Sequence, residues 1–409
     1  TTTWHVKIRN LEQYHFPTGD EIENKVSNDV DRGQIKMPKI DHDYATDAEL
    51  GQADGINNPQ GDASMVGAEF SIENASTHSV VVGGKEYQNG DLITTIPLPD
   101  GGTGNVITSG NDGIAATAER ALPYGTYIVR ETKAPEGYLL NSTASWTVTI
   151  TEHGQSIQAS GEDRIDDEVI RGGVAMPKVD TELTKLNGEE TNEGNPQGNA
   201  TFKGAQFTIR NKSKASVVVG GQLYAPDQDI MTIETGEDGI ASTAADALPY
   251  GTYELRETKA PEGYLITDET WTFSIREDGV IVRPDKETQV DDKIDNQVIR
   301  GGVAMPKIDT ELSQYAGEEQ KEGNPQGDAT VEGAEFEIKN VSSNHVLVDG
   351  VLYEPGAVVK TITTDANGVA STSADALPYG SYEIYEVEAP NGYHLSSDTH
   401  DGDGRGEVW

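Results

Sequence analysis

The chain repeats itself, at a period long enough to hold a whole folded domain. The block GGVAMPKVDTEL at 172–183 returns as GGVAMPKIDTEL at 301–312, and a divergent copy, GQIKMPKID, occupies 33–41. Other segments recur in the same order in all three copies: NPQG(D/N)A from Asn58, Asn195 and Asn324, GA(E/Q)F from Gly67, Gly204 and Gly333, and ALPYG(T/S)Y from Ala121, Ala247 and Ala376. A repeat of this length exceeds the roughly 20–50 residues of a solenoid unit, so each copy is predicted to be a domain.

Within each copy the sequence pattern is typical of short β-strands. Runs of Val, Ile, Tyr and Thr alternate with polar residues, and Gly, Asn and Asp interrupt them. Ser79–Tyr87 (SVVVGGKEY) predicts two strands joined by a turn at Gly83-Gly84. No stretch carries a sustained helical stripe of apolar residues, so helices are expected to be few and short. The pattern predicts an all-β chain of tandem sandwiches, with about seven or more strands in each repeat.

The repeat boundaries predict two complete domains between two incomplete ones. The complete copies are 33–170 and 172–299, whereas 301–409 is a truncated copy and 1–30 holds the last strands of a preceding or donated domain. The four tryptophans support this division, because Trp146 and Trp271 begin equivalent strands, Trp4 begins a similar one, and the sequence ends on Trp409. Only a short Arg-Gly-Gly segment separates consecutive copies, which predicts a linear array.

Composition and charge exclude several classes of function. The 30 Lys and Arg residues against 70 Asp and Glu residues give a formal net charge of −40, which argues against nucleic-acid binding and against anionic membrane surfaces. The absence of cysteine excludes a disulfide, a thiolate metal site and a Cys nucleophile. No apolar run approaches the roughly 18 residues of a membrane span, so no membrane insertion is expected in this segment.

The sequence also gives no sign of a turnover enzyme, a cofactor or a metal site. The eight histidines are scattered, and no His-x-x-x-His or Ser-His-Asp order indicates hydrolysis. The acidic loops, such as 41–54 and 188–194, do not match the spacing of an EF-hand loop. We interpret these loops as solvated segments that repel one another.

Each copy directs polar side chains toward its own core. Residues of a strand alternate between its two faces, so a polar residue in register with buried Ile, Val or Met also faces inward. The inward positions are Lys39, Lys178 and Lys307 in the first strand, Glu131, Glu257 and Glu386 in a middle strand, and Asn24, Asp167 and Asn296 in the last strand. Each complete copy therefore holds one Lys, one Glu and one Asn or Asp, while Lys307 and Glu386 lack a downstream acceptor and Asn24 lacks an upstream Lys and Glu.

These buried groups admit two interpretations. An unpaired buried charge costs several kcal/mol, so the side chains are expected to meet or to shift their pKa values. A lysine neutralised by burial is a nucleophile, and a protonated glutamate can hydrogen-bond a carbonyl and carry protons. Lysine Nζ can then attack Cγ of the acceptor, with loss of ammonia from Asn or water from Asp, to form an isopeptide bond. The residues alone equally allow an unreacted ion pair with a hydrogen-bonded Asn.

One motif links the repeats to a known family. RETKAPEGY at Arg130–Tyr138 and Arg256–Tyr264, with the looser YEVEAPNGY at Tyr385–Tyr393, resembles the E-box of collagen-adhesin B-type (Cna B-like, SpaA-type) domains. The MPK(V/I)D, GA(E/Q)F and LPYGTY segments are similar to that family at matching places, and the likeness covers all three copies.

The resemblance implies an immunoglobulin-like (prealbumin-like) sandwich with a self-formed isopeptide and a catalytic glutamate. In the first copy the resemblance assigns Lys39 as the lysine, Asp167 as the acceptor and Glu131 as the catalytic glutamate. In the second copy it assigns Lys178, Asn296 and Glu257 to the same three roles. Asp166 is the fallback acceptor in the first copy.

The expected function is a structural stalk or fibre segment of a Gram-positive surface adhesin or pilus, located outside the cell at the surface or in the cell wall. Its partners would be neighbouring repeats or copies of itself. The alternative is an adhesin module whose acidic loops bind a host protein or glycan. The incomplete copies at the two ends are complementary parts of one domain type, and this allows two explanations. The sequence is a slice of a longer tandem chain, which we favour, or residues 1–28 are donated to the third sandwich of a neighbouring molecule, where Asn24 would meet Lys307.

Overall fold

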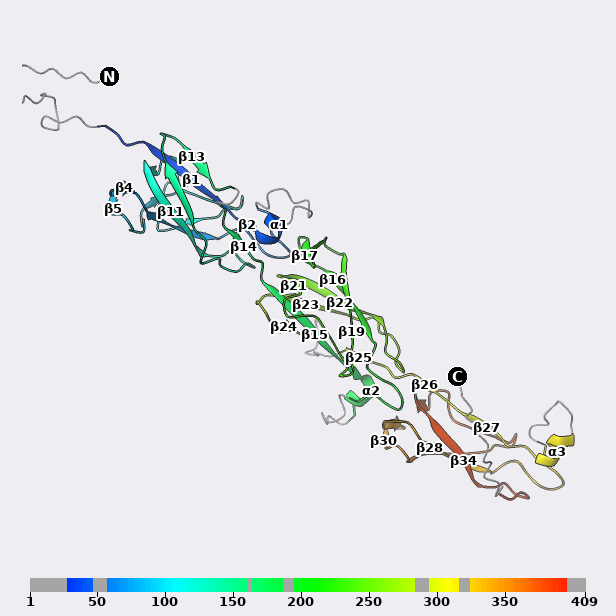
Figure 1. The fold of residues 1–409 in the computed structure, drawn as a ribbon. Helices are drawn as coiled ribbons and strands as arrows, with labels where there is room; N and C mark the ends of the chain where they lie inside the picture. The colour runs from blue at the N-terminus through cyan, green and yellow to red at the C-terminus, as the bar shows by residue number, and fades with distance from the viewer. Residues whose placement is uncertain are drawn as a thin grey trace, which may run out of the picture. The chain divides into compact units, whose positions relative to one another are not determined.

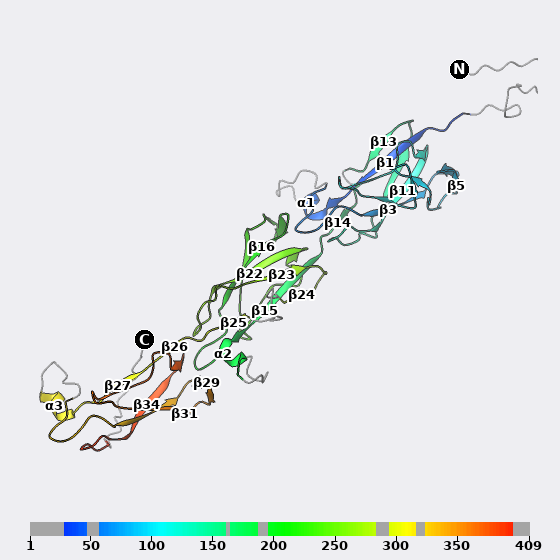
Figure 2. The same ribbon diagram turned by 180° about the vertical axis from the view of Figure 1, so that it is seen from behind.

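The computed structural model describes residues 28–46, 57–160, 164–186, 195–283, 294–315 and 324–395 of the chain. The chain divides into two compact units between Val169 and Ile170. The first unit holds one β-sandwich and the second unit holds two (Figures 1 and 2). The tryptophans at positions 4 and 409, on which the incomplete copies were predicted, lie outside the described residues.

In the first sandwich, a four-stranded antiparallel sheet packs against a second layer that is built around one long strand. The sheet has the order β12 (Trp146–Ile150), β11 (Gly125–Lys133), β3 (Glu69–Asn74) and β8 (Ile107–Thr108). The long strand is β1 (Arg32–Pro38), which pairs with β9 (Ile114–Ala116), β10 (Leu122–Pro123) and, in parallel, β13 (Ser156–Gln158). Just beyond β1, the short strand β2 (Ile40–Asp41) pairs in parallel with β14 (Asp166–Asp167). Two hairpins complete it: β4 (Val80–Val82) with β5 (Lys85–Tyr87), and β6 (Ile96–Pro97) with β7 (Thr103–Gly104).

The second sandwich repeats this plan. Its sheet has the order β19 (Asp229–Glu234), β16 (Gln206–Asn211), β22 (Gly251–Lys259) and β23 (Thr270–Ile275). Its long strand, β15 (Arg171–Asp180), pairs with β20 (Ile240–Ser242), β21 (Leu248–Pro249) and, in parallel, with β24 (Ile281–Val282) and β25 (Ile294–Asn296). The hairpin is β17 (Val217–Val219) with β18 (Gln222–Tyr224). In these two repeats the first strand therefore lies beside the last strand, although more than a hundred residues separate them.

In the third sandwich, the described residues include no counterpart of that last strand. Strands β31 (Val358–Thr363), β28 (Glu335–Asn340) and β34 (Tyr382–Glu388) form one sheet. The other pairs are β26 (Arg300–Gly301) with β33 (Leu377–Pro378), β27 (Ala304–Pro306) with β32 (Val369–Ser371), and β29 (Val346–Val348) with β30 (Val351–Tyr353). Met305 is half-buried here, whereas the equivalent Met176 of the second sandwich is fully buried.

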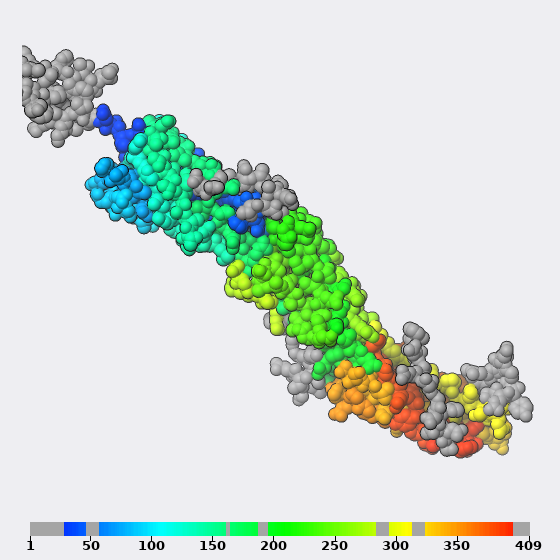
Figure 3. Space-filling view, viewed as in Figure 1, coloured from blue at the N-terminus to red at the C-terminus, as the bar shows by residue number. Residues whose placement is uncertain are grey.

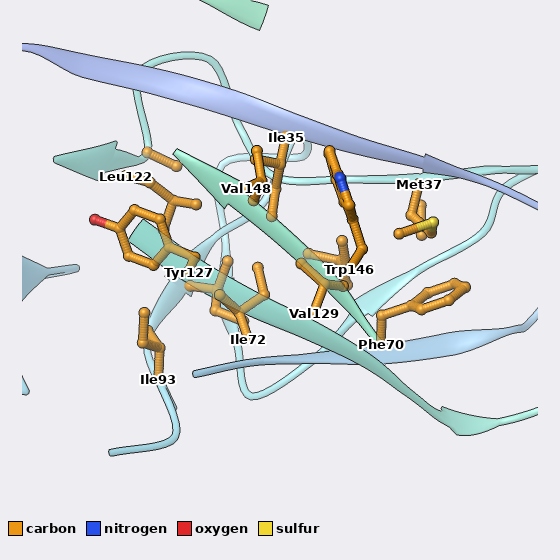
Figure 4. Close-up of a cluster of buried hydrophobic side chains, with 14 of the residues drawn as sticks. Ile35, Met37, Phe70, Ile72, Ile93, Leu122, Tyr127, Val129, Trp146 and Val148 are labelled. Atoms are coloured by element: carbon orange, nitrogen blue, oxygen red, sulfur yellow. The ribbon is translucent and has the colours of Figure 1, made fainter. Parts of the chain in front are cut away.

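The alternation of apolar residues explains the core. In β12, Trp146, Val148 and Ile150 are buried and the threonines between them are exposed. Figure 4 shows the result in the first sandwich, where Ile35 and Met37 of β1 meet side chains of the opposite sheet, among them Tyr127 and Val129. Removing such side chains from water stabilises a fold by about 25 cal/mol per Å² of apolar surface.

The recurring turn and LPYG segments have local structural reasons. Gly83 and Gly84 both have positive φ values (57° and 82°), which a glycine adopts without steric cost and which the β4–β5 turn requires. Each tyrosine that follows LPYG(T/S) donates its hydroxyl to the proline carbonyl four residues earlier, as in Tyr253 to Pro249 at 2.7 Å. Equivalent bonds join Tyr127 to Pro123 and Tyr382 to Pro378.

Helices are few and short among the described residues, as predicted. They are α1 (His42–Thr46), α2 (Thr181–Thr184) and α3 (Thr310–Tyr315). α2 follows the long first strand β15 directly, whereas α1 follows β2 and α3 begins four residues after the end of β27. In the second repeat, the carboxylate of Asp180 accepts hydrogen bonds from the backbone N–H groups of Glu182 and Leu183 and so caps α2.

Within the second unit, polar side chains join the second and third repeats. Arg300, at the start of the third repeat, places Nη2 at 2.7 Å from Oε2 of Glu182 in the second repeat. Gly198 of the second repeat accepts a bond from Asn344 of the third, and a Cβ at Gly198 would lie 2.0 Å from the carbonyl oxygen of Tyr379. Figure 3 shows the orange atoms of the third repeat against the green atoms of the second.

Candidate functional site

The candidate site of the second repeat lies between the two layers of its sandwich. Lys178 is near the end of β15, Asn296 ends β25, and Glu257 comes from β22 in the opposite sheet. In the parallel pairing of β15 with β25, Lys178 is opposite Ile294 and Asp180 is opposite Asn296. Lys178 and Asn296 are therefore diagonal neighbours on the same face, and their side chains meet in the core.

The three side chains form a closed hydrogen-bonded group. Lys178 Nζ donates to Asn296 Oδ1 and lies 2.9 Å from Glu257 Oε1, and the Lys178 and Glu257 side chains are fully buried (0% exposed). Asn296 Nδ2 donates to both Glu257 oxygens at 3.1 and 2.8 Å and to the Leu265 carbonyl at 2.8 Å. The Thr267 N–H donates to Glu257 Oε2 at 3.0 Å. Lysine and acceptor thus contact each other while one carboxylate contacts both.

Burial sets the electrostatics of this group. Removal from water lowers the pKa of Lys178 to about 8, and the neighbouring Glu257 opposes that shift. The shift makes the neutral amine more accessible than it is for a lysine in water. A surface hollow lined by Leu265, Thr267 and Asn296 opens beside the acceptor.

The first repeat brings together Lys39, Glu131 and Asp167 in the same way. Lys39 Nζ lies 2.9 Å from Glu131 Oε1 and 2.6 Å from Asp167 Oδ2, and all three side chains are fully buried (0% exposed). Burial raises the pKa of Glu131 to about 8, with Lys39 opposing, and it also raises the pKa of Asp167. Two acids share one lysine, so one of them keeps its proton at neutral pH.

The structure also separates the two candidate acceptors of the first repeat. Asp166 keeps 29% of its side chain exposed and pairs with His42 at 2.8 Å. Asp167, on the opposite side of the strand, faces Lys39. The preferred acceptor, rather than the fallback, is therefore the one beside the lysine.

The third repeat has half of this group. Lys307 Nζ lies 2.7 Å from Glu386 Oε1, and the two side chains are 19% and 17% exposed. Within the described part of the chain, no acceptor side chain stands beside Lys307. Asn24 lies outside the described residues, so its pairing with Lys307 stays a prediction.

A second polar cluster, which the sequence reasoning missed, lies next to each lysine. It consists of an Asp two residues after the lysine, the Gln of NPQG and the Tyr that ends the E-box. The members are Asp41, Gln60 and Tyr138, then Asp180, Gln197 and Tyr264, then Asp309, Gln326 and Tyr393. The Asp, Gln and Tyr residues recur at equivalent positions in all three copies, which was the available signal in the sequence. That recurrence did not indicate that their side chains are in contact.

The described residues contain no group of three or more His, Cys, Asp or Glu side chains arranged to hold a metal ion. In the same residues, no helix is both long enough and apolar enough to span a bilayer.

Comparison with known proteins identifies the family. A family model described as SpaA, a prealbumin-like fold domain, matches residues 58–164, 176–288 and 320–401, one match in each copy. Because the matches cover more than half of the chain, the protein belongs to the SpaA family of prealbumin-like domains. The family resemblance of the E-box and the all-β fold of tandem prealbumin-like sandwiches are both confirmed. A search of curated proteins finds no match.

The chain is also similar to several solved structures. They include the Bacillus anthracis TIE protein (21% identity, TM-score 0.47, covering 90% of this chain and 47% of that one), BcpA, the major pilin subunit of Bacillus cereus (16%, 0.26, 90% and 93%), and the shaft pilin SpaA from Lactobacillus rhamnosus GG (16%, 0.22, 66% and 98%). The chain spans about half the length of the TIE protein.

Proposed function

We propose that the chain is a structural stalk or fibre segment of a Gram-positive surface adhesin or pilus, outside the cell, in which an isopeptide bond locks each complete repeat. One observation carries the proposal. In both 33–170 and 172–299, a buried lysine of the first strand contacts an Asn or Asp of the last strand, and a glutamate contacts the lysine. In this proposal 301–409 and 1–30 are parts of the same domain type, and the only chemistry is a single self-directed turnover.

In the second repeat the reaction would proceed by amide exchange. Glu257 accepts a proton from the Lys178 ammonium, and the neutral Nζ attacks Cγ of Asn296. A proton passes to Nδ2, the Cγ–Nδ2 bond breaks and the Nζ–Cγ amide remains. The products are the amide, ammonia and protonated Glu257, so protons and charge balance. The contacts of Glu257 with both nitrogens support its role as proton carrier.

The first repeat would release water instead. The starting groups are the Lys39 ammonium, the Asp167 carboxylate and a protonated Glu131, which together carry no net charge. After proton transfer, Nζ attacks the Asp167 carboxyl carbon and one acceptor oxygen leaves as water. Glu131 ends the reaction protonated.

The position of the bond suits a protein under tension. It joins the first strand of a repeat to its last strand across 118 residues in the second repeat. Force that enters at the first strand can leave through the bond without loading the hydrogen-bonded ladders. A tie of this span also restricts the unfolded chain by roughly 4–5 kcal/mol on the loop-closure relation used for disulfides. The net charge of −40 keeps neighbouring fibres apart.

The alternative function, a ligand-binding adhesin module, depends on the acidic loops. Most of those loop residues, including 47–56 and 187–194, lie outside the described residues. No observation in the described part of the chain favours this alternative. Binding of the purified chain to matrix proteins would support it, because a spacer should bind none.

Intact-mass spectrometry tests the chemistry. The denatured chain should be lighter than its sequence mass by one ammonia and one water. Glu257→Ala removes the proton carrier, so the ammonia should be retained while the water is still lost, and the second repeat should fold but melt at a lower temperature. Glu254→Ala, on the opposite face of the same strand, should leave both losses intact. An unshifted wild-type mass would leave only the ion-pair interpretation.

The rate of water loss in the first repeat should depend on pH in one direction. Burial keeps Glu131 protonated up to about pH 8. The reacting state, with a neutral amine and two protonated acids, holds as many protons as the ground state, so the rate should be flat below about pH 8. Above it, loss of the Glu131 proton should slow the reaction about tenfold per pH unit. Freshly synthesised chain followed by mass spectrometry from roughly pH 6 to 10 provides the measurement, and a rate that rises throughout would contradict this order of protonation.

Single-molecule pulling tests the mechanical role. Neither complete repeat of the wild type should release the contour length of its bridged segment. Lys178→Ala should restore extension of the second repeat and leave the first repeat inextensible. Release of roughly 100 or more residues of contour length from each wild-type repeat, at about 3.5 Å per residue, would contradict the force path.

Denaturing gel electrophoresis tests whether another molecule supplies the acceptor for Lys307. We expect purified chain to run as a single monomer band on a denaturing gel. A strand supplied by another molecule must first overcome an association cost of about 4–15 kcal/mol. A covalent ladder that disappears in both Asn24→Ala and Lys307→Ala would contradict this expectation and would identify exchange of residues 1–28 between molecules.

A further inference from the structure

A buried carboxylate that the proposed reaction does not use recurs beside each lysine. Asp41 and Asp180 are 0% and 1% exposed, and each lies two residues after the lysine of its repeat. Tyr264 donates its hydroxyl to Asp180 Oδ2 at 2.9 Å, and Gln197 Nε2 donates to the two Asp180 oxygens at 3.2 and 3.1 Å. In the first repeat, Tyr138 and Gln60 make the same bonds to Asp41.

The cluster holds three segments that surround the reacting groups. Asp180 ends the lysine strand and is opposite Asn296 in the β15–β25 register. Tyr264 forms a β-bridge with Val298, two residues after Asn296. The next residue, Leu265, donates its N–H to the Gln297 carbonyl and accepts a bond from Asn296 Nδ2. The hydroxyl of Tyr264 therefore connects the lysine strand to the backbone that flanks the acceptor.

The carboxylate is anchored from several directions. Besides Tyr264 and Gln197, the N–H groups of Glu182 and Leu183 donate to Asp180 Oδ1 at 2.8 and 3.0 Å. These donors offset the desolvation of a buried carboxylate, which otherwise costs several kcal/mol. They also fix the point at which β15 ends and α2 begins.

The third repeat contains the same cluster around Asp309. Asp309 accepts bonds from Tyr393 at 2.8 Å, from Gln326 at 3.0 Å and from the Leu312 N–H at 2.9 Å. These bonds are present although the described residues place no acceptor beside Lys307.

We propose that Asp180, Gln197 and Tyr264 position Lys178 and Asn296 for bond formation, and that Asp41, Gln60 and Tyr138 do so for Lys39 and Asp167. The inference rests on the proposed isopeptide chemistry and adds a second group of residues to it. Attack of Nζ on Cγ requires the two atoms to be aligned at about 3 Å, and a misplacement of 1 Å can slow such a reaction by about a hundredfold. The cluster touches neither reacting atom; it holds the strands that carry them.

Tyr264→Phe tests this role because it removes one hydroxyl and keeps the ring. The full chain is made by cell-free synthesis, and the losses of ammonia and water are followed over time by intact mass. Tyr264→Phe should slow the loss of ammonia by about tenfold or more, while the loss of water in the first repeat continues at the wild-type rate and serves as an internal clock. Tyr138→Phe should give the reciprocal result.

Tyr253→Phe is the matched control. It removes a buried hydroxyl bond from the same repeat, to the Pro249 carbonyl at 2.7 Å, but at the LPYG corner. Both variants lose one buried hydrogen bond and should lower the melting temperature by similar amounts, yet only Tyr264→Phe should slow the reaction. If protease digestion shows that Tyr264→Phe does not fold, Asp180→Asn takes the place of that variant in the assay. Asparagine has the same shape as aspartate and can still cap α2.

Equal rates of ammonia loss in wild type, Tyr253→Phe and the folded cluster variant would overturn the inference and leave the cluster a purely stabilising role. Failure of the proposed function looks different, because the wild type itself would then lose neither ammonia nor water.

Discussion

The contact between the first and last strands of a repeat determines most of what this molecule can do. Parallel pairing brings Lys178 and Asn296 together across 118 residues, and the opposite sheet adds Glu257. A lone ammonium in that place would be strongly unfavourable, and ion pairing alone rarely compensates fully for the desolvation of two buried charges. Covalent bond formation removes both charges from the core. The arrangement that is costly as an ion pair is therefore well suited to a reaction.

In both complete repeats a buried lysine ammonium lies beside a glutamate, but the third side chain of the group differs. With Asn296, the group holds one cation and one carboxyl. With Asp167 it holds one cation and two carboxyls, and burial raises the pKa of Glu131 to about 8, so that a single negative charge faces Lys39 at neutral pH. In the proposed reaction the leaving group would be ammonia in one repeat and water in the other, while the contacts of lysine, glutamate and acceptor are similar in both.

Strand periodicity was enough to predict the fold class and the inward direction of the lysines and glutamates, because alternate residues of a strand share a face. The same alternation, with Ile165 and Val169 facing inward, predicted Asp167 rather than Asp166 as the inward residue, and the structure places Asp167 beside Lys39 and Asp166 beside His42. The Asp41, Gln60 and Tyr138 cluster was beyond reach. Its members lie on three segments that are far apart in the chain, and hydrogen bonds between their side chains, which no local pattern indicates, bring them together.

The isopeptide proposal requires that a covalent bond, rather than a hydrogen bond, joins Lys178 to Asn296. Protease digestion of the unfolded chain, followed by fragmentation of the peptides in the mass spectrometer, tests this bond at the level of single residues. The expected products are a branched peptide in which the Lys178 side chain is linked to the Asn296 side chain, and a second one that links Lys39 to Asp167. Recovery of only linear peptides, with Lys178 and Asn296 unmodified, would contradict it.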